Sequence, residues 1–228
     1  MPVTPTAADM RLDGGHPALD LVNTVYGQVG APPEHDVLST PEDLVTFARR
    51  VDMAGARTPA SPAALAAARR LRDALDAVLH AHLHGAAAPP GAAAAVADAV
   101  RAALAAAHLA PAGDARPGGS VTAAGPARSA GDARPAGAGP VPSGPAYAWT
   151  WPAADPLVPV HRLALAAAAL LQSPDELARL HRCAGCRWLF LDRSRGAGRR
   201  WCSMADCGTE AKKRRYVARR RERRARQL

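Results

Sequence analysis

The sequence predicts an α+β fold class: a mostly helical amino-terminal domain with a few short strands, followed by a small module that holds every cysteine. Three observations support this prediction. Apolar residues recur at helical spacing through most of the first part, the four cysteines lie in the last quarter, and an arginine-rich segment follows them. We therefore expect two units, over residues 9–178 and 179–228.

Helices are predicted throughout the first unit, because apolar stripes follow recognisable helix starts. In Thr40-Pro41, Thr40 can cap the helix and Pro41 suits its first turn, and Ser61-Pro62 and Ser173-Pro174 repeat this pattern. The predicted helices cover residues 17–25, 40–51, 61–85, 92–109, 157–171 and 173–180. Short strands are predicted near residues 10–12 and over residues 147–151, where aromatic and small residues alternate.

Residues 111–145 interrupt this pattern of elements. Glycine, proline and alanine occupy 8, 7 and 9 of these 35 positions, and Val121 and Val141 are the only bulky aliphatic residues. Such a segment cannot bury enough apolar surface to offset the entropy lost on ordering. The sequence therefore predicts a flexible excursion within the first unit.

The cysteines form two pairs, Cys183/Cys186 and Cys202/Cys207, with 15 residues between the pairs. This spacing predicts one structural Zn²⁺ held by four thiolates. The alternative, two disulfides in a secreted domain, is disfavoured because the chain shows no signal peptide. No run of large apolar residues is long enough for a membrane span. We expect a cytoplasmic protein that does not contact membranes.

The module around this ion is predicted to be treble-clef-like. Cys183-Ala-Gly-Cys186 would form a tight knuckle, and residues 188–192 and 199–201 would pair as a hairpin that brings Trp188 opposite Trp201. Cys207 would lie near the start of a final basic helix, whose dipole favours a thiolate.

Positive charge is concentrated in this module. Residues 183–228 contain 15 Lys and Arg against 4 Asp and Glu, a net charge of +11, whereas the remaining residues carry −2. A cationic end on a nearly neutral body predicts that the partner is nucleic acid or another anionic surface. The predicted contacts are Arg193, Arg195, Arg199, Arg200, Lys212, Lys213, Arg214, Arg215, Arg219 and Arg220. A merely solubilising tail is the alternative.

These residues resemble a known family. The cysteine pairs, Phe190-x-Asp192-x-Ser194-Arg195, Arg199-Arg-Trp-Cys-Ser-Met204 and Cys207-Gly208 are similar to the CGNR zinc finger. Residues 14–24, Gly-Gly-His-Pro-Ala-Leu-Asp-Leu-Val-Asn-Thr, and residues 40–44, Thr-Pro-Glu-Asp-Leu, resemble the ABATE domain that accompanies it. The resemblance implies an α/β sensing domain and a stress-linked transcription regulator.

One departure from the family pattern lies beside the metal. The family sequence Cys-Gly-Asn-Arg is here Cys207-Gly208-Thr209-Glu210, so that Glu210 reverses the charge of the family's arginine. A contact that this arginine makes with nucleic acid therefore does not carry over, and Arg214, one turn later, is the candidate to replace it. Zinc binding is expected to persist, because neither residue is a ligand.

Other candidate sites are weaker. Asp20, Asn23 and His161 could line a ligand pocket, although local turn or capping bonds are the favoured role of Asp20 and Asn23. The motif His80-x-His82-x-His84 could bind a metal, but it more simply ends a helix near a negative dipole. No catalytic triad, phosphate-binding loop or metalloprotease motif is present, so we expect no enzyme.

The leading hypothesis is a DNA-binding transcription regulator whose helical body senses a small-molecule effector or forms a homodimer. A second hypothesis is association with RNA or the ribosome through the same basic surface. A third is a small-molecule-binding protein with an incidental basic tail, for which a deep polar pocket around Asp20, Asn23 and His161 would be needed.

Overall fold

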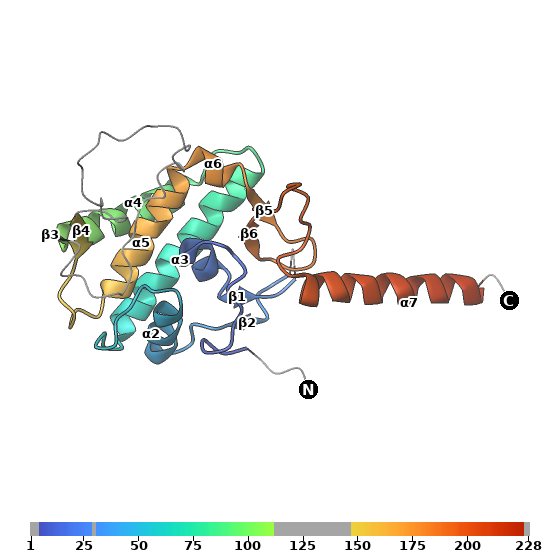
Figure 1. The fold of residues 1–228 in the computed structure, drawn as a ribbon, viewed down its shortest axis with the longest axis horizontal. Coiled ribbons are helices and arrows are strands. Elements are labelled where there is room, and N and C mark those ends of the chain that lie inside the picture. The colour runs from blue at the N-terminus through green and yellow to red at the C-terminus, as the bar shows by residue number, and fades with distance from the viewer. Residues whose placement is uncertain (1–4, 29–30, 112–146, 226–228) are drawn as a thin grey trace, which may run out of the picture.

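The computed structural model describes residues 5–28, 31–111 and 147–225 (Figure 1). The helices are α1 (Pro17–Val22), α2 (Pro41–Arg50), α3 (Pro62–Leu83), α4 (Pro90–Ala105), α5 (Val158–Leu171), α6 (Pro174–Leu177) and α7 (Thr209–Ala225). The strands are β1 (Val25–Tyr26), β2 (His35–Asp36), β3 (His108–Pro111), β4 (Tyr147–Thr150), β5 (Leu180–Arg182) and β6 (Leu189–Leu191). This is the expected α+β class, a helical body with a few short strands.

The body is built around α3, which packs against α1, α2, α4 and α5 (Figure 1). Phe47 of α2, Leu75 of α3 and Leu163 of α5 are fully buried in the resulting core. Burial of such side chains is the main favourable term in folding, at about 25 cal/mol per Å² of apolar surface. None of the helices in the described ranges combines the length and the apolar character needed to cross a bilayer.

The predicted helix starts are confirmed. The Thr40 hydroxyl accepts a hydrogen bond from the Asp43 N–H at 3.2 Å, while the Asp43 carboxylate accepts from the Thr40 N–H at 2.8 Å. Ser61 and Ser173 cap α3 and α6 through their hydroxyl groups, each of which accepts from the N–H three residues later. Each cap satisfies an N–H that has no partner within the helix.

Several predicted boundaries shift because tertiary pairing competes with helix. The first helix ends at Val22, and Val25–Tyr26 pairs with His35–Asp36 instead of extending it. The fourth helix ends at Ala105, and the residues that follow form β3, antiparallel to β4 with Leu109 opposite Trp149. The predicted strand at residues 147–151 is confirmed as β4. The predicted flexible excursion lies outside the described residues, except for Pro111.

The predicted strand near residues 10–12 is wrong. Met10 is fully buried, but its N–H donates to the Thr6 carbonyl at 2.9 Å in a local turn and joins no strand ladder. Residues 10–12 therefore belong to an irregular segment that buries Met10 without forming a strand.

The predicted hairpin of the module is also wrong. β6 pairs with β5, which precedes the first cysteine pair, so that Cys183–Cys186 itself closes the hairpin. Residues 199–201 form no strand. The reason is that Leu180 and Leu191 lie opposite each other and are both buried in the core of the body. Arg199 and Arg200 could not provide such an apolar pairing.

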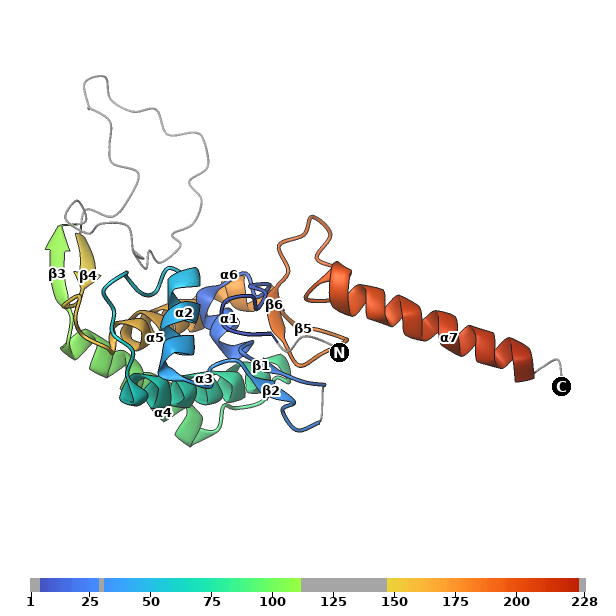
Figure 2. The same cartoon turned by 90° about the horizontal axis from the view of Figure 1, so that it is seen from below.

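Helix α7 extends away from the body (Figure 2). Its main packing partner is the turn Met204–Gly208 that precedes it. Over residues 209–224 every side chain is exposed except Ala211, which is half-buried. The helix is held at its start and is otherwise open to solvent.

Candidate metal centre and nucleic-acid interface

The four cysteine sulfurs converge on one point. The Sγ atoms of Cys183, Cys186, Cys202 and Cys207 all lie within 4.8 Å of one another. Cys202 Sγ is 3.7 Å from both Cys186 Sγ and Cys207 Sγ, too far for a disulfide. Four sulfurs placed tetrahedrally at about 2.3 Å from one Zn²⁺ are roughly 3.8 Å apart. The donor set and its spacing therefore fit a closed zinc site.

Local structure positions the first pair. The Cys183 N–H donates to the Trp188 carbonyl at 2.9 Å, which closes the knuckle, and the Gly185 N–H donates to Cys183 Sγ at 3.3 Å. Gly185 is tightly enclosed, since a Cβ there would lie 3.0 Å from the Cys207 Cβ. The two cysteine pairs are in contact here, so that a Cβ at residue 185 would force Cys207 to shift.

The second pair is held by the turn before α7. Ser203 accepts from the Asp206 N–H at 3.3 Å, and this bond starts the turn that carries Cys207. Cys183 and Cys202 are buried, whereas Cys186 and Cys207 are half-exposed. Hydrogen bonds from Cys186, Cys202 and Cys207 lower the pKa of the Cys183 thiol. A thiolate, the form that binds zinc, is thus favoured at Cys183, where the neighbouring thiols stabilise it.

Aromatic rings pack beside the sulfurs. Trp188 and Phe190 are buried and Trp201 is half-buried, all in one apolar cluster with the four cysteines. The two tryptophans thus lie beside the four cysteines as expected, although residues 199–201 form no strand opposite the segment of Trp188. A module of this size needs both the ion and the rings, because its apolar core alone is small.

Asp192 and Arg199 organise the loop between the cysteine pairs. The Asp192 carboxylate accepts from the N–H groups of Ser194 and Arg199 at 2.9 and 2.8 Å, and the hydrogen bonds of Ser194 and Arg199 lower its pKa to about 2. The Arg199 guanidinium lies 4.6 Å from the Phe190 ring centroid and donates to the carbonyls of Trp201 and Cys202. Arg199 therefore stabilises the loop that connects the two cysteine pairs.

The predicted nucleic-acid contacts divide into two groups. On the loop, Arg193 binds Glu176 at 2.9 Å, and Arg200 lies 5.3 Å from the Trp201 ring centroid; Arg195 is exposed and joins neither pair. Both pairs lie at the surface. The predicted cations of α7, Lys212, Lys213, Arg214, Arg215, Arg219 and Arg220, are all exposed. Arg221, Arg223 and Arg224 share this exposure and extend the set; the arginine-rich run 219–224, interrupted only by Glu222, is the signal that identifies them.

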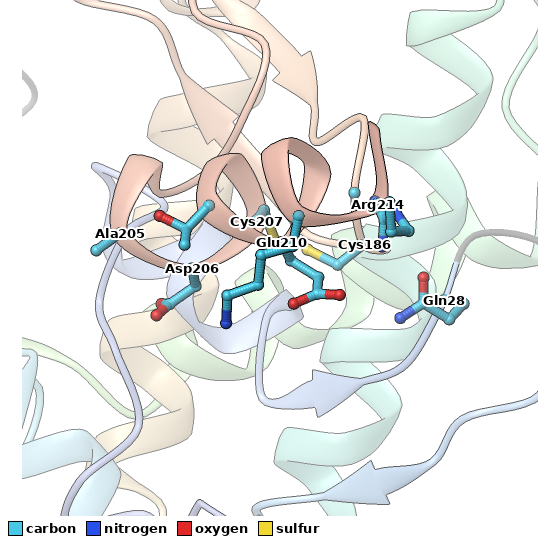
Figure 3. Close-up of a pocket in the computed structure, with 10 residues that line it drawn as sticks. Gln28, Cys186, Ala205, Asp206, Cys207, Glu210 and Arg214 are labelled. Carbon is cyan, nitrogen blue, oxygen red and sulfur yellow. The ribbon is translucent and has the colours of Figure 1, made fainter. Parts of the chain in front are cut away.

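A hollow lies between the metal ligands and the start of α7 (Figure 3). Its volume is about 360 Å³. Cys186 and Cys207 line it together with Gln28, Asp206, Ala205, Glu210 and Arg214. Glu210, the departure from the family pattern, thus borders the same hollow as Arg214, its suggested replacement.

The zinc module docks on the body through backbone groups. The Asn23 side chain donates to the Leu189 carbonyl at 2.8 Å and accepts from the Leu189 N–H at 2.9 Å. The Trp188 indole N–H donates to the Val25 carbonyl at 3.2 Å, and the Leu191 N–H donates to the Gly14 carbonyl at 2.9 Å. Sequence reasoning did not find this interface, because its partners are far apart in the chain.

The interface has an apolar side as well. Leu180, Leu189 and Leu191 belong to the same buried cluster as the helices of the body. The expected division between residues 178 and 179 therefore separates two sequence motifs that share one hydrophobic core.

The candidate ligand pocket is not assembled as predicted. Asp20 accepts from the Gly14 N–H at 2.9 Å, a local bond as favoured, and Asn23 is engaged by Leu189. His161 stacks on Trp151 and lines a cavity of about 530 Å³ between α3, α4 and α5. Neither Asp20 nor Asn23 lines that cavity, which is bordered mainly by alanine and other apolar side chains.

The three histidines His80, His82 and His84 lie at the end of α3, as the structural interpretation predicts. His84 Nδ1 lies 2.7 Å from the His80 carbonyl at the end of α3, and His80 faces Asp76 at 3.3 Å. His181 stacks on Phe190. Within the described ranges, the four cysteines are the one cluster of three or more His, Cys, Asp or Glu side chains that could hold a metal ion.

Two family-model matches agree with this architecture. The family model for ABATE, described as "Putative stress-induced transcription regulator", matches residues 15–174, and the model for the CGNR zinc finger matches residues 179–220. No curated protein was found that matches the chain. The cysteine geometry and the zinc-finger match together identify one structural Zn²⁺. Because the first match covers more than half of the chain, the protein belongs to the ABATE family and carries a CGNR zinc finger.

Proposed function

We propose that the protein is a cytoplasmic, DNA-binding transcription regulator whose zinc module presents α7 to the duplex. The observation that carries this proposal is the exposure of α7: nine described lysines and arginines project from a helix that packs only at its start. Without a partner, these like charges repel one another and raise the free energy of the helix; phosphate groups neutralise them. Zinc fixes the start of the helix and hence its direction.

The shape of this element favours DNA over RNA. The helix is 17 residues long, about 25 Å, and carries cations around most of its circumference. The major groove of B-form DNA admits an α-helix between two phosphate backbones, whereas the corresponding groove of A-form RNA is too deep and narrow. Binding to RNA through the same surface is the competing outcome of the test below.

Neither catalysis nor a polar ligand site is needed for this role. Four thiolates complete the tetrahedral shell and leave no open coordination position, so we propose a binding protein and no enzyme. The buried, mainly apolar surroundings of Asp20 and Asn23 speak against the small-molecule-binding alternative centred on them. The cavity beside His161 is our candidate for an effector, and the exposed rings of Tyr147 and Trp149 are our candidates for a homodimer contact.

The test is binding of the zinc-loaded protein to duplex DNA as a function of salt. About 6 to 10 phosphate contacts predict that affinity falls about 10³ to 10⁵-fold between 50 and 200 mM salt. Removal of zinc with a chelator should abolish tight binding. Binding that ignores salt or zinc would contradict the proposal, as would a clear preference for RNA over DNA at the same salt concentration.

A matched pair of variants locates the surface. Arg214→Gln/Arg215→Gln removes two exposed cations from α7, and Arg57→Gln/Arg101→Gln removes two exposed cations from the body. We expect the first variant to weaken binding and reduce the salt dependence by about two phosphate contacts, and the second to leave both unchanged. Equal losses in both variants would show that net charge alone is responsible.

A further inference from the structure

Two apolar side chains on α7 are out of place on a helix that only neutralises phosphate. Tyr216 is 64% exposed and Val217 is 45% exposed. They are the only large apolar residues between Thr209 and Ala225. Both are weaker helix formers than the lysine, arginine and alanine around them, so they do not serve the stability of the helix itself.

Their surroundings are uniformly cationic. On a helix, the surface neighbours of a residue lie three and four positions away in each direction. For Tyr216 these are Lys212, Lys213, Arg219 and Arg220; for Val217 they are Lys213, Arg214, Arg220 and Arg221. Every neighbour of both residues is therefore a lysine or an arginine. Ala218, the next residue, lacks this arrangement, because Glu222 lies four positions after it.

The helix surface is open to solvent at this point. Val217 borders an open hollow of about 270 Å³ whose charged lining residues are Lys213, Arg214, Arg221 and, two turns before Val217, Glu210. Consecutive residues on a helix diverge by about 100°, so Tyr216 and Val217 present two adjacent directions of one broad face. The helix thus carries an apolar centre surrounded by cations.

We propose that Tyr216 and Val217 read the DNA sequence by apolar contact with base edges in the major groove. This rests on the proposed function. With α7 lying in the groove, its middle approaches the floor, where the thymine methyl group is the apolar feature that distinguishes bases. The surrounding cations reach the phosphates on both sides and fix the register. Tyr216 and Val217 are thus specificity-determining residues, and the cations supply the affinity.

The experiment begins with selection from a duplex DNA pool with a randomised centre, using the full-length zinc-loaded protein. Affinities for the enriched duplex and for a scrambled duplex are then measured for the wild type and for Tyr216→Gln/Val217→Gln. Glutamine keeps the charge unchanged and is a good helix former. Zinc content and circular dichroism establish that the variant is folded.

We expect the glutamine variant to lose about tenfold or more in affinity for the enriched duplex, with little change for the scrambled one and an unchanged salt dependence. The matched control, Arg220→Gln/Arg221→Gln, should weaken both duplexes alike and reduce the salt dependence. Equal effects of the glutamine variant on both duplexes, or no effect, would overturn the inference.

The two levels of the proposal fail in different ways. If the wild type binds DNA with strong salt dependence but enriches no sequence, this inference is wrong while the proposed function stands. If the wild type binds no DNA at all, both are wrong.

Discussion

Asp20 is a buried carboxyl group with few compensating partners. It is 6% exposed and accepts one hydrogen bond, from the Gly14 N–H. Burial raises the pKa of Asp20 from 3.8 to about 7; the Gly14 bond opposes this shift, and the negative charge of Asp13 adds to it. Between pH 3.8 and about 7, Asp20 is therefore protonated in the native state and ionised in the unfolded state.

This shift predicts how stability depends on pH. Because the native state holds more protons than the unfolded state between pH 3.8 and about 7, stability falls as pH rises through that window. The loss from Asp20 amounts to up to about 4 kcal/mol. Asp20→Asn keeps an acceptor for Gly14 and should remove this loss. We expect the free energy of unfolding of the variant, relative to wild type, to increase between pH 5 and 8.

Chemical denaturation at several pH values measures this difference, and comparison with wild type cancels the contribution of the metal-binding thiols. The exposed Asp52→Asn variant is the control and should show a constant offset. A constant offset for Asp20→Asn as well would contradict the assignment.

At the scale of single elements, the signals that predict structure correctly are local. The caps at Thr40, Ser61 and Ser173 and the cysteine spacing each involve residues within a few positions of one another. The partner of β6 and the strand β3 could not be predicted in this way, because pairing depends on which side chains the rest of the fold buries. The role of Arg199 could not be predicted for the same reason. An arginine in a cationic segment indicates a phosphate contact, whereas in the structure its guanidinium packs on the Phe190 ring and donates hydrogen bonds to two carbonyls.

The knuckle provides a prediction at this scale. Gly185→Ala introduces a Cβ 3.0 Å from the Cys207 Cβ and 3.4 Å from its Sγ, so the two cysteine pairs must move apart. We expect zinc affinity to fall about 10 to 100-fold, as for other changes next to metal ligands. Competition with a chromophoric chelator measures the change. Gly196→Ala, where no atom lies within 4 Å of the new Cβ, should leave zinc affinity unchanged.

For the whole molecule, the important feature is the shared core. Leu180, Leu189 and Leu191 come from the strands that the metal holds, yet they are buried with the helices of the body. Binding of zinc to the native state alone should therefore stabilise the entire chain. We therefore expect the two family regions to unfold together, although they are separate in sequence.

Zinc removal tests this coupling. We expect chelation to lower the melting temperature recorded by the helical circular dichroism signal, which arises mainly from α2–α5. The melt should remain a single transition, and added Zn²⁺ should restore the original temperature whereas Mg²⁺ should not. An unchanged helical melt after verified loss of zinc would show that the module unfolds independently.

The bond between Asn23 and Leu189 spans 166 positions of the chain, and its consequence concerns synthesis. At about 5–20 residues per second, Asn23 is translated roughly 8 to 33 s before its partner exists. During that interval the apolar surface destined for β5 and β6 stays uncovered, which invites aggregation. Nascent chains should therefore bind chaperones until the last cysteines emerge and capture their ion.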